Sequence, residues 1–356
     1  MNDDKYLVWV YCSTFNQADY IIDTMDGFCR QETSFPFICT ILDDASTDGE
    51  QEVIRKYLED NFILEAATNL INRDKEDFKC IFARHRTNHN CYFAVLFLNY
   101  NHYSIKKTKF SYLDNFFSIK YMARCEGDDY WIDSLKLQKE VAFLEANSDY
   151  SMVYTAYRRI NQSNSDVQII EAPQDYLYYN NDCKWAILTN DIKIGTATVL
   201  YKTDVYNRIR NDFADDYIDA RMADVQTWFH FARISKIHYL PDITAAYRKH
   251  EGGVTSINSI KRFEFLKNAL DIHYRLAMKY DAPGHIKELI IGRFGVSLLS
   301  TGIDYRLYDK CIALTKEYMP HNRLLLVLLR MGKSILFLKP SMVKRVVLYL
   351  LSDKTK

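Results

Sequence analysis

The chain has 356 residues, and its 46 basic and 46 acidic side chains give a formal net charge of zero at neutral pH. Hydrophobic residues make up 48% of the sequence, enough for a packed interior, while 11 glycines and 6 prolines are too few for a collagen or an extended disordered protein. Eight cysteines in so long a chain exclude a small disulfide scaffold, and zero net charge argues against a wholly basic protein, so we expect no nucleic-acid partner.

The chain up to about residue 255 predicts alternating strands and helices. Short apolar runs predict strands over Leu7–Ser13, Phe37–Leu42, Lys79–Arg84, Tyr121–Cys125, Tyr150–Tyr154, Ile194–Tyr201 and Lys236–Leu240. Apolar residues at helical spacing predict helices after the first two strands, after Asp133 and over Asp219–Arg233. Strands and helices that alternate in this way favour an α/β fold, in which helices cover a parallel sheet.

Two segments are predicted to be irregular. Asn99–Leu113 is polar and contains lysines, and we interpret it as an insertion between two strands. Asp166–Lys184 is dense in tyrosine and aspartate with little periodicity, which is typical of a loop region over a site. From Ile260 onward the pattern is helical, and we place a domain boundary near Thr255.

The C-terminal region differs from the rest of the chain in charge. Lys310–Lys356 holds ten basic and two acidic residues, a net charge of +8, which leaves 36 basic and 44 acidic residues, or −8, for residues 1–309. Its leucine-rich runs are far shorter than the ~18 to 20 residues of a membrane-spanning helix. The segment is therefore either a basic amphipathic surface helix on a membrane or a pair of core helices with solvated lysines.

The N-terminus, Met1–Lys5, is polar and acidic, unlike the basic stretch and apolar run of a secretory signal. We therefore expect a cytoplasmic protein, with a peripheral contact at the cytoplasmic face of the membrane if the C-terminal region binds lipid.

Carboxylates gather where two predicted strands end. Glu126-Gly127-Asp128-Asp129 holds three carboxylates in four positions, and like charges this close repel unless something positive binds. Asp43-Asp44 follows another strand, and open α/β sheets bind ligands beyond the carboxyl ends of their strands. Hard oxygen ligands select Mg²⁺ or Mn²⁺, with phosphate oxygens to complete the octahedron. The alternative is a pair of acidic turns that cap helices.

The common phosphate-binding loops are missing. The sequence has no G-x-x-x-x-G-K-[ST] motif and no G-x-G-x-x-G after the first strand. A phosphate group would therefore be held by a metal ion and basic side chains.

Five motifs in this order and spacing resemble the family 2 glycosyltransferases, inverting enzymes that use nucleotide sugars. They are Ser13–Asn16, Asp43–Gly49, Glu126–Trp131, Asp224 ahead of Trp228, and Tyr247–Gly253. The resemblance implies the GT-A fold, a mostly parallel sheet flanked by helices with a C-terminal helical extension. It implies a catalytic domain over residues 1–255, whose nucleotide-binding half ends near residue 133 and whose acceptor-binding half covers about 134–255, followed by a helical, basic amphipathic region over 256–356.

The resemblance also implies roles for individual residues. Asp224 would be the general base. The nucleotide sugar would be bound by Thr14, Asn16, Asp43, Asp44, Arg86, Asp128 and Arg248, with Asp44 near the base or ribose. A divalent cation, Mn²⁺ or Mg²⁺, would be held by Asp128, Asp129 and His250. Alternatives stay open: Arg84 or Asn88 in place of Arg86, and Asp215, Asp216 or Asp219 in place of Asp224.

The implied activity is transfer of a sugar from a nucleoside-diphosphate sugar, with a UDP-sugar favoured, to a hydroxyl of a glycan or lipid-linked acceptor. Such enzymes build cell-surface polysaccharides. Two other functions remain open on the sequence. One is a non-catalytic module that binds a nucleotide sugar or serves as a scaffold, and the other is a nucleotidyltransferase, which would normally carry a glycine- and lysine-rich phosphate loop near the first strand.

Overall fold

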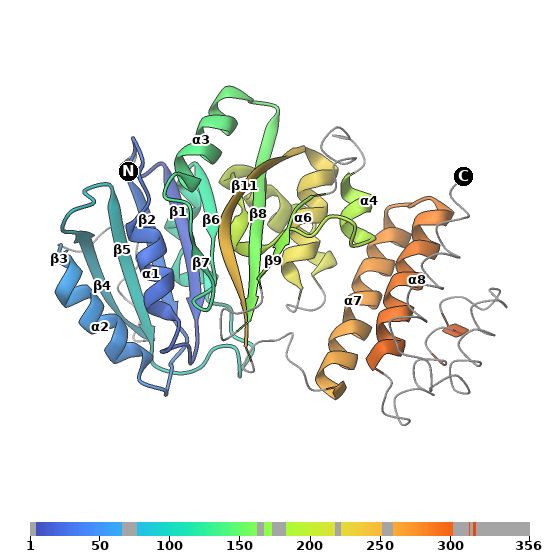
Figure 1. Ribbon diagram of the computed structural model, residues 1–356, viewed down its shortest axis with the longest axis horizontal. Coiled ribbons are helices and arrows are strands. Elements are labelled where there is room, and N and C mark those ends of the chain that lie inside the picture. The colour runs from blue at the N-terminus through green and yellow to red at the C-terminus, as the bar shows by residue number, and fades with distance from the viewer. Residues whose placement is uncertain are drawn as a thin grey trace. The chain divides into compact units, whose positions relative to one another are not determined.

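The computed structural model describes residues 5–65, 77–161, 167–172, 183–217, 222–250 and 259–301, together with Ala313, Lys316 and Glu317. The chain divides into two compact units (Figure 1). The first comprises Met1–Asn181, Lys193–Asp215 and His230–Arg248, and the second comprises Asp182–Ile192, Asp216–Phe229 and Lys249–Lys356. The boundary predicted near Thr255 lies outside the described residues.

One mixed sheet forms the centre of the first unit. In the described residues its strands are β1 (Val8–Thr14), β2 (Phe37–Asp43), β3 (Phe62–Leu64), β4 (Phe78–His85), β5 (Cys91–Leu98), β6 (Tyr121–Arg124), β7 (Tyr130–Trp131), β8 (Tyr150–Asn161), β9 (Val167–Ile170), β10 (Leu200–Lys202) and β11 (Lys236–Lys249). Their order is β3-β4-β5-β2-β1-β6-β10-β8-β11-β7, and β9 pairs with β8.

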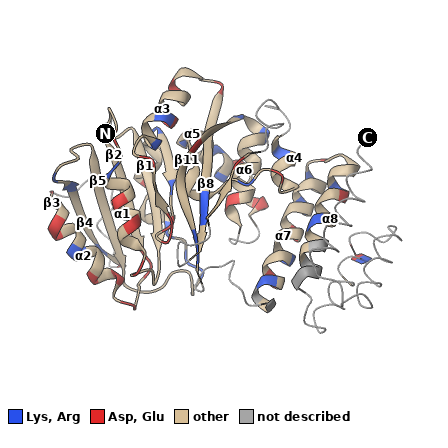
Figure 2. Ribbon diagram, in the orientation of Figure 1, with Lys and Arg blue, Asp and Glu red and all other residues tan. Residues whose placement is uncertain are grey.

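The helices of the described chain are α1 (Ile21–Cys29), α2 (Glu50–Asn61), α3 (Lys136–Ala146), α4 (Cys183–Leu188), α5 (Thr203–Asp212), α6 (Ala223–Ile234), α7 (Ser259–Lys279) and α8 (Gly284–Thr301). Short 3₁₀ turns are η1 (Phe110–Tyr112), η2 (Asp114–Ser118), η4 (Thr196–Thr198) and η5 (Ala214–Asp216). Acidic side chains lie along α1 and α2, which belong to the negatively charged first 309 residues (Figure 2).

The parallel part of the sheet consists of β5, β2, β1 and β6. Every residue of β2 and β5 is buried, as expected for parallel strands with both faces covered. Thr14 pairs with Asp43, and Asp43 pairs with Phe97, so these strands end level with one another. We call this end of the sheet the carboxyl edge. The loops after β1, β2 and β6 meet there.

The strand β7 follows Glu126–Asp129, which we call the acidic loop, and packs on α1. A Cβ atom at Gly27 would lie 2.8 Å from the Trp131 nitrogen and 2.9 Å from its carbonyl oxygen, so only glycine permits this approach. The rings of Phe28 and Trp131 meet edge to face with centroids 4.8 Å apart. This packing holds β7, the strand that follows the acidic loop, against α1.

The predicted α/β fold, a parallel sheet flanked by helices, is confirmed, with several local differences. Cys91–Leu98, which no sequence prediction assigned, is the fully buried strand β5, between β4 and β2. Val167–Ile170 forms strand β9 where a loop was predicted. The strand predicted over Ile194–Tyr201 is a 3₁₀ turn followed by the short strand β10. The last two residues of the predicted loop, Cys183 and Lys184, begin α4, and residues 173–182 lie outside the described residues.

The second unit has its own apolar cluster, formed by α7 and α8 with parts of α4 and α6. It includes Leu188, Phe229, Leu276 and Ile290. His273 Nδ1 donates a 2.6 Å hydrogen bond to the Leu188 carbonyl, and burial lowers the pKa of His273 to about 4. Within the described residues, no helix is long and apolar enough to cross a membrane. The leucine-rich runs after Lys310 lie outside them.

Candidate functional site

The loops after β1 and β2 are joined by Glu50, the first residue of α2. Its side chain is fully buried, and the Thr14 hydroxyl bonds to Glu50 Oε1. Glu50 Oε2 accepts hydrogen bonds from the Gln17 N–H at 2.9 Å and the Ser46 hydroxyl at 2.8 Å. Burial raises the pKa of Glu50, and these donors partly offset that rise. Sequence reasoning did not find Glu50, although it holds the predicted residue Thr14 in place.

Asn16 forms a second link between the same loops. Its backbone has φ 54°, a left-handed conformation that asparagine tolerates better than most residues. The Asn16 N–H donates to Ser46 Oγ at 2.9 Å, and Asn16 Oδ1 accepts the Thr47 N–H at 2.8 Å. Asn16 is exposed and lies at the carboxyl edge. The nucleotide-sugar contact predicted for it stays a prediction.

Asp43 shapes the turn that leads into α2. It is fully buried, and its carboxylate accepts the Ser46 N–H at 3.3 Å and the Gln51 side-chain amide at 2.5 Å. Burial raises the pKa of Asp43. Its contacts are those of an acidic turn before a helix, the alternative that the sequence left open.

The next residue, Asp44, is covered by the insertion. Its side chain is 1% exposed. Oδ1 accepts the His102 N–H at 2.7 Å, and Oδ2 accepts the Tyr103 N–H at 3.1 Å. Lys109 Nζ lies 3.1 Å from Asp44 Oδ2 and 3.1 Å from Ser13 Oγ, so it brings a positive charge to the carboxyl edge. Lys109 belonged to a segment predicted as irregular, and no spacing marked it.

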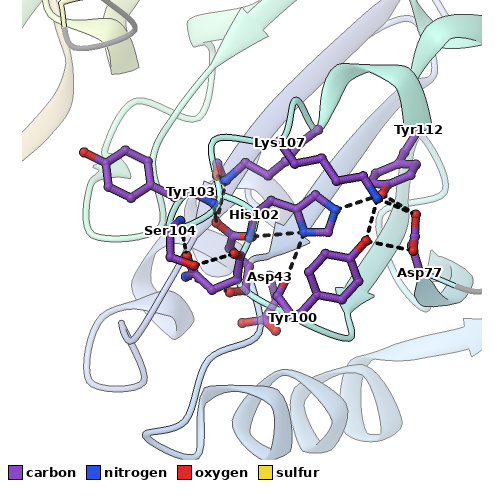
Figure 3. A network of polar contacts seen from close by, with 12 residues as sticks. Asp43, Asp77, Tyr100, His102, Tyr103, Ser104, Lys107 and Tyr112 are labelled. Carbon is purple, nitrogen blue, oxygen red and sulfur yellow. Dashed lines mark hydrogen bonds and ion pairs between the residues drawn. The ribbon is translucent and has the colours of Figure 1, made fainter.

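The insertion is anchored at its other side by Asp77 (Figure 3). The Asp77 carboxylate accepts hydrogen bonds from the Tyr100 hydroxyl at 2.9 Å, from Lys107 at 2.9 Å and from the Tyr112 hydroxyl at 2.7 Å. These donors hold the pKa of Asp77 well below its usual range, and burial raises the pKa of Tyr112 to about 12. The polar insertion is therefore an ordered element.

Gly127 brings the acidic loop against the end of β1. Its N–H donates to the Ser13 carbonyl at 3.2 Å. A Cβ atom there would overlap Thr14 Oγ1 and lie 2.5 Å from Gln17 Oε1, so the close approach requires glycine. The Thr24 hydroxyl on α1 contacts the carbonyls of Gly127 at 2.8 Å and Asp129 at 2.6 Å.

The carboxylates of the acidic loop lie in different surroundings. Glu126 and Asp128 are half-buried, whereas Asp129 is 4% exposed and its Oδ1 accepts the Arg248 N–H at 2.9 Å. Burial, together with the charges of Asp128 and Glu126, raises the pKa of Asp129 well above its usual value. Glu126 and Asp128 are therefore the carboxylates of this loop that stay partly accessible.

Arg248 holds this loop from β11. Its guanidinium donates to the Asp128 carbonyl at 2.9 Å and to Asp23 Oδ2 at 2.6 Å, and its centre lies 4.8 Å from the Tyr20 ring and 4.9 Å from the Tyr130 ring. Arg248 is only 5% exposed. We interpret Arg248 as a residue that positions the acidic loop. The nucleotide-sugar contact predicted for it stays a prediction.

Arg86 does not lie with the other predicted residues. β4 runs antiparallel to β5, with Phe78 opposite Leu98 and Arg84 opposite Tyr92. β4 therefore leads away from the carboxyl edge, and Arg86 follows its far end, where its N–H donates to the Asn61 carbonyl at 3.0 Å. The Asn88 amide also lies at that end, bonded to the carbonyls of Cys29 and Gln31. Lys109, unlike Arg86, is a basic residue that lies at the carboxyl edge.

Asp224 and His250 belong to the second unit. Asp224 is the second residue of α6 and is half-buried, and His250 directly follows β11. Their predicted roles as general base and metal ligand stay predictions. Asp216, an alternative to Asp224, is fully buried and bonded to Lys279 and the Tyr280 hydroxyl at 2.6 Å each, which explains it as a structural residue. Asp219 lies outside the described residues.

The acidic loop fits a cation that takes most of its ligands from a substrate. No cluster of three or more histidine, cysteine or carboxylate side chains in the described chain could enclose a metal ion. Glu126 and Asp128 nevertheless offer hard oxygen donors beside the buried Asp129. Mg²⁺ and Mn²⁺ sites of this kind are completed by one or two carboxylates and by phosphate oxygens.

Comparison with solved structures identifies the fold. The mannosyltransferase PcManGT from Pyrobaculum calidifontis, solved with GDP-Man and Mn²⁺, matches over 97% of this chain and 84% of its own, with 14% identity and a TM-score of 0.53. The chain has a GT-A-like fold. TarS from S. aureus, residues 1–349 with UDP-GlcNAc, matches over 92% of this chain and 91% of its own, with 13% identity and a TM-score of 0.48.

Sequence comparison finds relatives that share more residues with this chain than the solved structures do. Uncharacterized proteins of Mycobacterium tuberculosis and Mycobacterium bovis are 28% identical over 249 residues, or 68% of this chain. The chain spans 58% of the length of these mycobacterial relatives. No family model matches the sequence.

Proposed function

We propose that the protein is an inverting glycosyltransferase. It moves a sugar from a nucleoside-diphosphate sugar, with a UDP-sugar favoured, to a hydroxyl of a glycan or lipid-linked acceptor. The proposed setting is the synthesis of cell-surface polysaccharide at the cytoplasmic face of a membrane. The observation that carries the proposal is the carboxyl edge, where Gly127 seats Glu126 and Asp128 directly on the end of β1 within a GT-A-like fold.

The chemistry needs a base and a stabilised leaving group. An acceptor hydroxyl is a poor nucleophile, so a carboxylate must take its proton as the oxygen attacks C1 of the sugar. The bond between C1 and the diphosphate oxygen breaks in the same displacement, which inverts the anomeric carbon. We propose Asp224 as this base, because it opens a helix in the position that the resemblance assigns to it.

The leaving nucleoside diphosphate gains negative charge. When bound, Mn²⁺ or Mg²⁺ would neutralise this charge as a Lewis acid. We propose Asp128 as the principal protein ligand, with Asp129 and His250 as further ligands. Lys109, whose ammonium lies between Ser13 and Asp44, replaces Arg86 as the proposed basic residue near the nucleotide.

The proposal is tested by donor turnover. The full-length protein is incubated with Mn²⁺, a panel of nucleotide sugars and lipid-linked acceptors, and nucleoside diphosphate release is measured. We expect acceptor-dependent release that stops when a chelator removes the metal. Asp224→Asn should lower kcat by about 10² to 10⁴, the usual contribution of a general base.

Asp215→Asn is the matched control, because Asp215 is exposed and close to Asp224 in the chain. It should leave turnover unchanged. Full turnover in Asp224→Asn would show that another group is the base. Binding of nucleotide sugars without turnover on any acceptor would contradict the catalytic proposal and favour a binding module.

A further inference from the structure

Arg124 is a basic side chain that the proposed mechanism does not use. It is the last residue of β6 and pairs with Tyr11 of β1, and paired residues on neighbouring strands point to the same face of the sheet. Its guanidinium carbon lies 5.4 Å from the centre of the Tyr11 ring. The side chain is half-buried and its Nε is fully buried, yet within the described residues Nε has no hydrogen-bond partner and the guanidinium forms no ion pair. An unpaired charge in such a place is costly to fold, which points to a negatively charged ligand.

The same face of the sheet carries a layer of aromatic rings. The Tyr11 ring lies 5.4 Å from Phe110 of η1, and Tyr206 of α5 stacks on Phe117 of η2 with ring centroids 6.1 Å apart. Phenylalanine rings have no strong hydrogen-bond acceptor and carry no charge. The layer beside Arg124 therefore contributes packing, and it leaves the positive charge without a counter-charge.

A second guanidinium lies on this aromatic layer. The guanidinium carbon of Arg210, on α5, is 4.3 Å from the centre of the Phe117 ring and 5.2 Å from that of Phe110. Arg210 is half-buried, and in the part of the chain that the structure describes it forms no ion pair either. Arg208 on the same helix, by contrast, is paired with Asp212 at 3.2 Å. Two positive charges without protein partners on one face favour the binding of an anion there.

The place of Arg124 in the chain indicates which anion this is. Arg124 comes two residues before Glu126, the first residue of the acidic loop. The proposed function places the diphosphate of the donor at the acidic loop, so the anion left for Arg124 is one that a sugar carries. A guanidinium presents a planar fork of N–H groups that matches the two oxygens of a carboxylate. The carboxylate of a uronic acid fits this description.

We propose that Arg124 selects an acidic sugar, a uronic acid whose carboxylate pairs with its guanidinium, and that Arg210 adds positive charge to the same face. The inference rests on the proposed nucleotide-sugar transferase function and narrows its substrate class. The carboxylate belongs either to the transferred sugar or to the acceptor sugar. Glu126 would repel a second carboxylate nearby, so an acidic sugar is accepted only where a cation such as Arg124 offsets that charge.

The first arm of the test concerns the donor. UDP-glucuronate and UDP-glucose differ only at C6, which is a carboxylate in one and a hydroxymethyl group in the other. Their binding to the full chain is measured by titration calorimetry with Mn²⁺. If the donor carries the carboxylate, UDP-glucuronate should bind about tenfold or more tightly, the usual effect of a hydrogen bond to a charged group. Arg124→Met should remove this preference and leave the affinity for UDP, which has no sugar, within about twofold.

The second arm concerns the acceptor. Release of the nucleoside diphosphate is measured with an aryl glucuronide and with the matching aryl glucoside, using whichever donor gives turnover. If the acceptor carries the carboxylate, the glucuronide should give the higher kcat/KM by about tenfold or more, and Arg124→Met should remove the difference.

Three further variants separate recognition from packing. Arg124→Lys keeps the charge without the planar fork and should keep part of the preference, so it also serves if Arg124→Met does not fold. Arg210→Met should reduce the preference less than Arg124→Met does, because it removes only a second charge. Arg208→Met is the matched control on α5, at a side chain 64% exposed, and should leave the preference unchanged. A purely structural defect lowers binding of the acidic and the neutral sugar alike, and so does not move their ratio.

Two results would overturn the inference and leave the proposed function intact. One is a wild type that binds UDP-glucuronate and UDP-glucose equally and uses both acceptors equally. The other is a preference for the acidic sugar that persists undiminished in both Arg124→Met and Arg124→Lys. Absence of turnover with every donor and acceptor would count against the proposed function, and the inference would fall with it.

Discussion

Gly127 is the residue on which the geometry of the candidate site depends most directly. It allows the acidic loop to touch Thr14 and Gln17, and a methyl group there would overlap Thr14, a buried β-branched side chain with little freedom to move. We expect Gly127→Ala to lower the free energy of unfolding by about 1–3 kcal/mol, the usual cost of overpacking. It should also weaken Mn²⁺-dependent nucleotide binding, because the loop carries Asp128. Urea unfolding and calorimetry measure the two effects.

Gly284, at the start of α8, provides the matched control. No atom lies within 4 Å of a Cβ built at this position, and its φ is not in the left-handed region. Gly284→Ala should therefore be neutral or stabilising by about 0.4–1 kcal/mol, since alanine restricts the unfolded chain. Equal destabilisation by both substitutions would contradict the steric explanation for Gly127.

Arg248 leads to a second prediction at the scale of single residues. Arg248→Met removes hydrogen bonds to Asp23 and to the Asp128 carbonyl, and we expect a loss of about 1.5–3 kcal/mol of stability, typical for hydrogen bonds of a charged group. The nucleotide affinity measured with Mn²⁺ should fall as well, because the loop loses its support. Asp23→Asn should reproduce part of both effects, although Asp23 is a half-exposed side chain on α1.

The two substitutions should be non-additive in a double-mutant cycle, because they break one interaction. Arg158→Met, at an exposed position on β8, is the control and should change neither quantity. Additive effects of Arg248→Met and Asp23→Asn would show that Arg248 acts without its partner on α1.

At the scale of elements, the sequence predicted strands and helices best where an apolar run or a periodic pattern ends in a clear turn signal. β1, α1, β2 and α2 follow their predicted positions closely. Cys91–Leu98 was missed because eight consecutive apolar residues show no period that separates a strand from a helix. β4 runs antiparallel to β5, and no local sequence pattern indicates the direction of a strand. For that reason Arg86 was assigned to the wrong end of the sheet.

The helix α3 carries a buried ion pair with a testable pH dependence. Lys136 Nζ lies 2.7 Å from both oxygens of Glu140, and both side chains are fully buried. Burial raises the pKa of Glu140 from 4.5 to about 7, although the charge of Lys136 opposes the shift. The folded protein therefore keeps this proton up to a higher pH than the unfolded chain, so the associated stability is present below pH 4.5 and is lost as the pH rises through 7.

The comparison variant is the double substitution Lys136→Met with Glu140→Leu, which removes both charges. Between pH 4.5 and 8 the wild type should lose about 3 kcal/mol relative to it, at 1.36 kcal/mol for each unit of pKa shift. Glu140→Leu alone should be the least stable, by about 3–5 kcal/mol, because it leaves the Lys136 ammonium buried without its partner. A constant difference between wild type and double variant across this pH range would contradict the interpretation.

At the scale of the whole molecule, the sequence located the candidate site but not its internal roles. The carboxylate clusters predicted a ligand at the ends of the strands, and the structure brings Thr14, Asn16, Asp43, Asp44 and Asp128 to one edge. Which of these side chains stay accessible depends on the insertion and on β11, segments that return to the edge from distant parts of the chain. Spacing along the sequence carries no information about such cover, so the burial of Asp44 and Arg248 could not be predicted.

The uneven charge of the chain leads to the last prediction. Lys310–Lys356 carries a net charge of +8 against −8 for the first 309 residues, and each basic residue close to an anionic bilayer contributes about 1 kcal/mol. We expect the full chain to bind vesicles that contain phosphatidylserine and to leave vesicles of phosphatidylcholine alone. Replacing Lys333, Lys339, Lys344 and Arg345 with glutamine should weaken this binding by up to about 4 kcal/mol. In the wild type, raising the salt concentration to 1 M should also weaken the binding, because salt screens the charges. Because none of the four belongs to the proposed site, metal-dependent nucleotide binding should stay unchanged. Equal sedimentation of wild type and variant with the anionic vesicles would contradict the prediction and would mean that this segment does not bind the membrane.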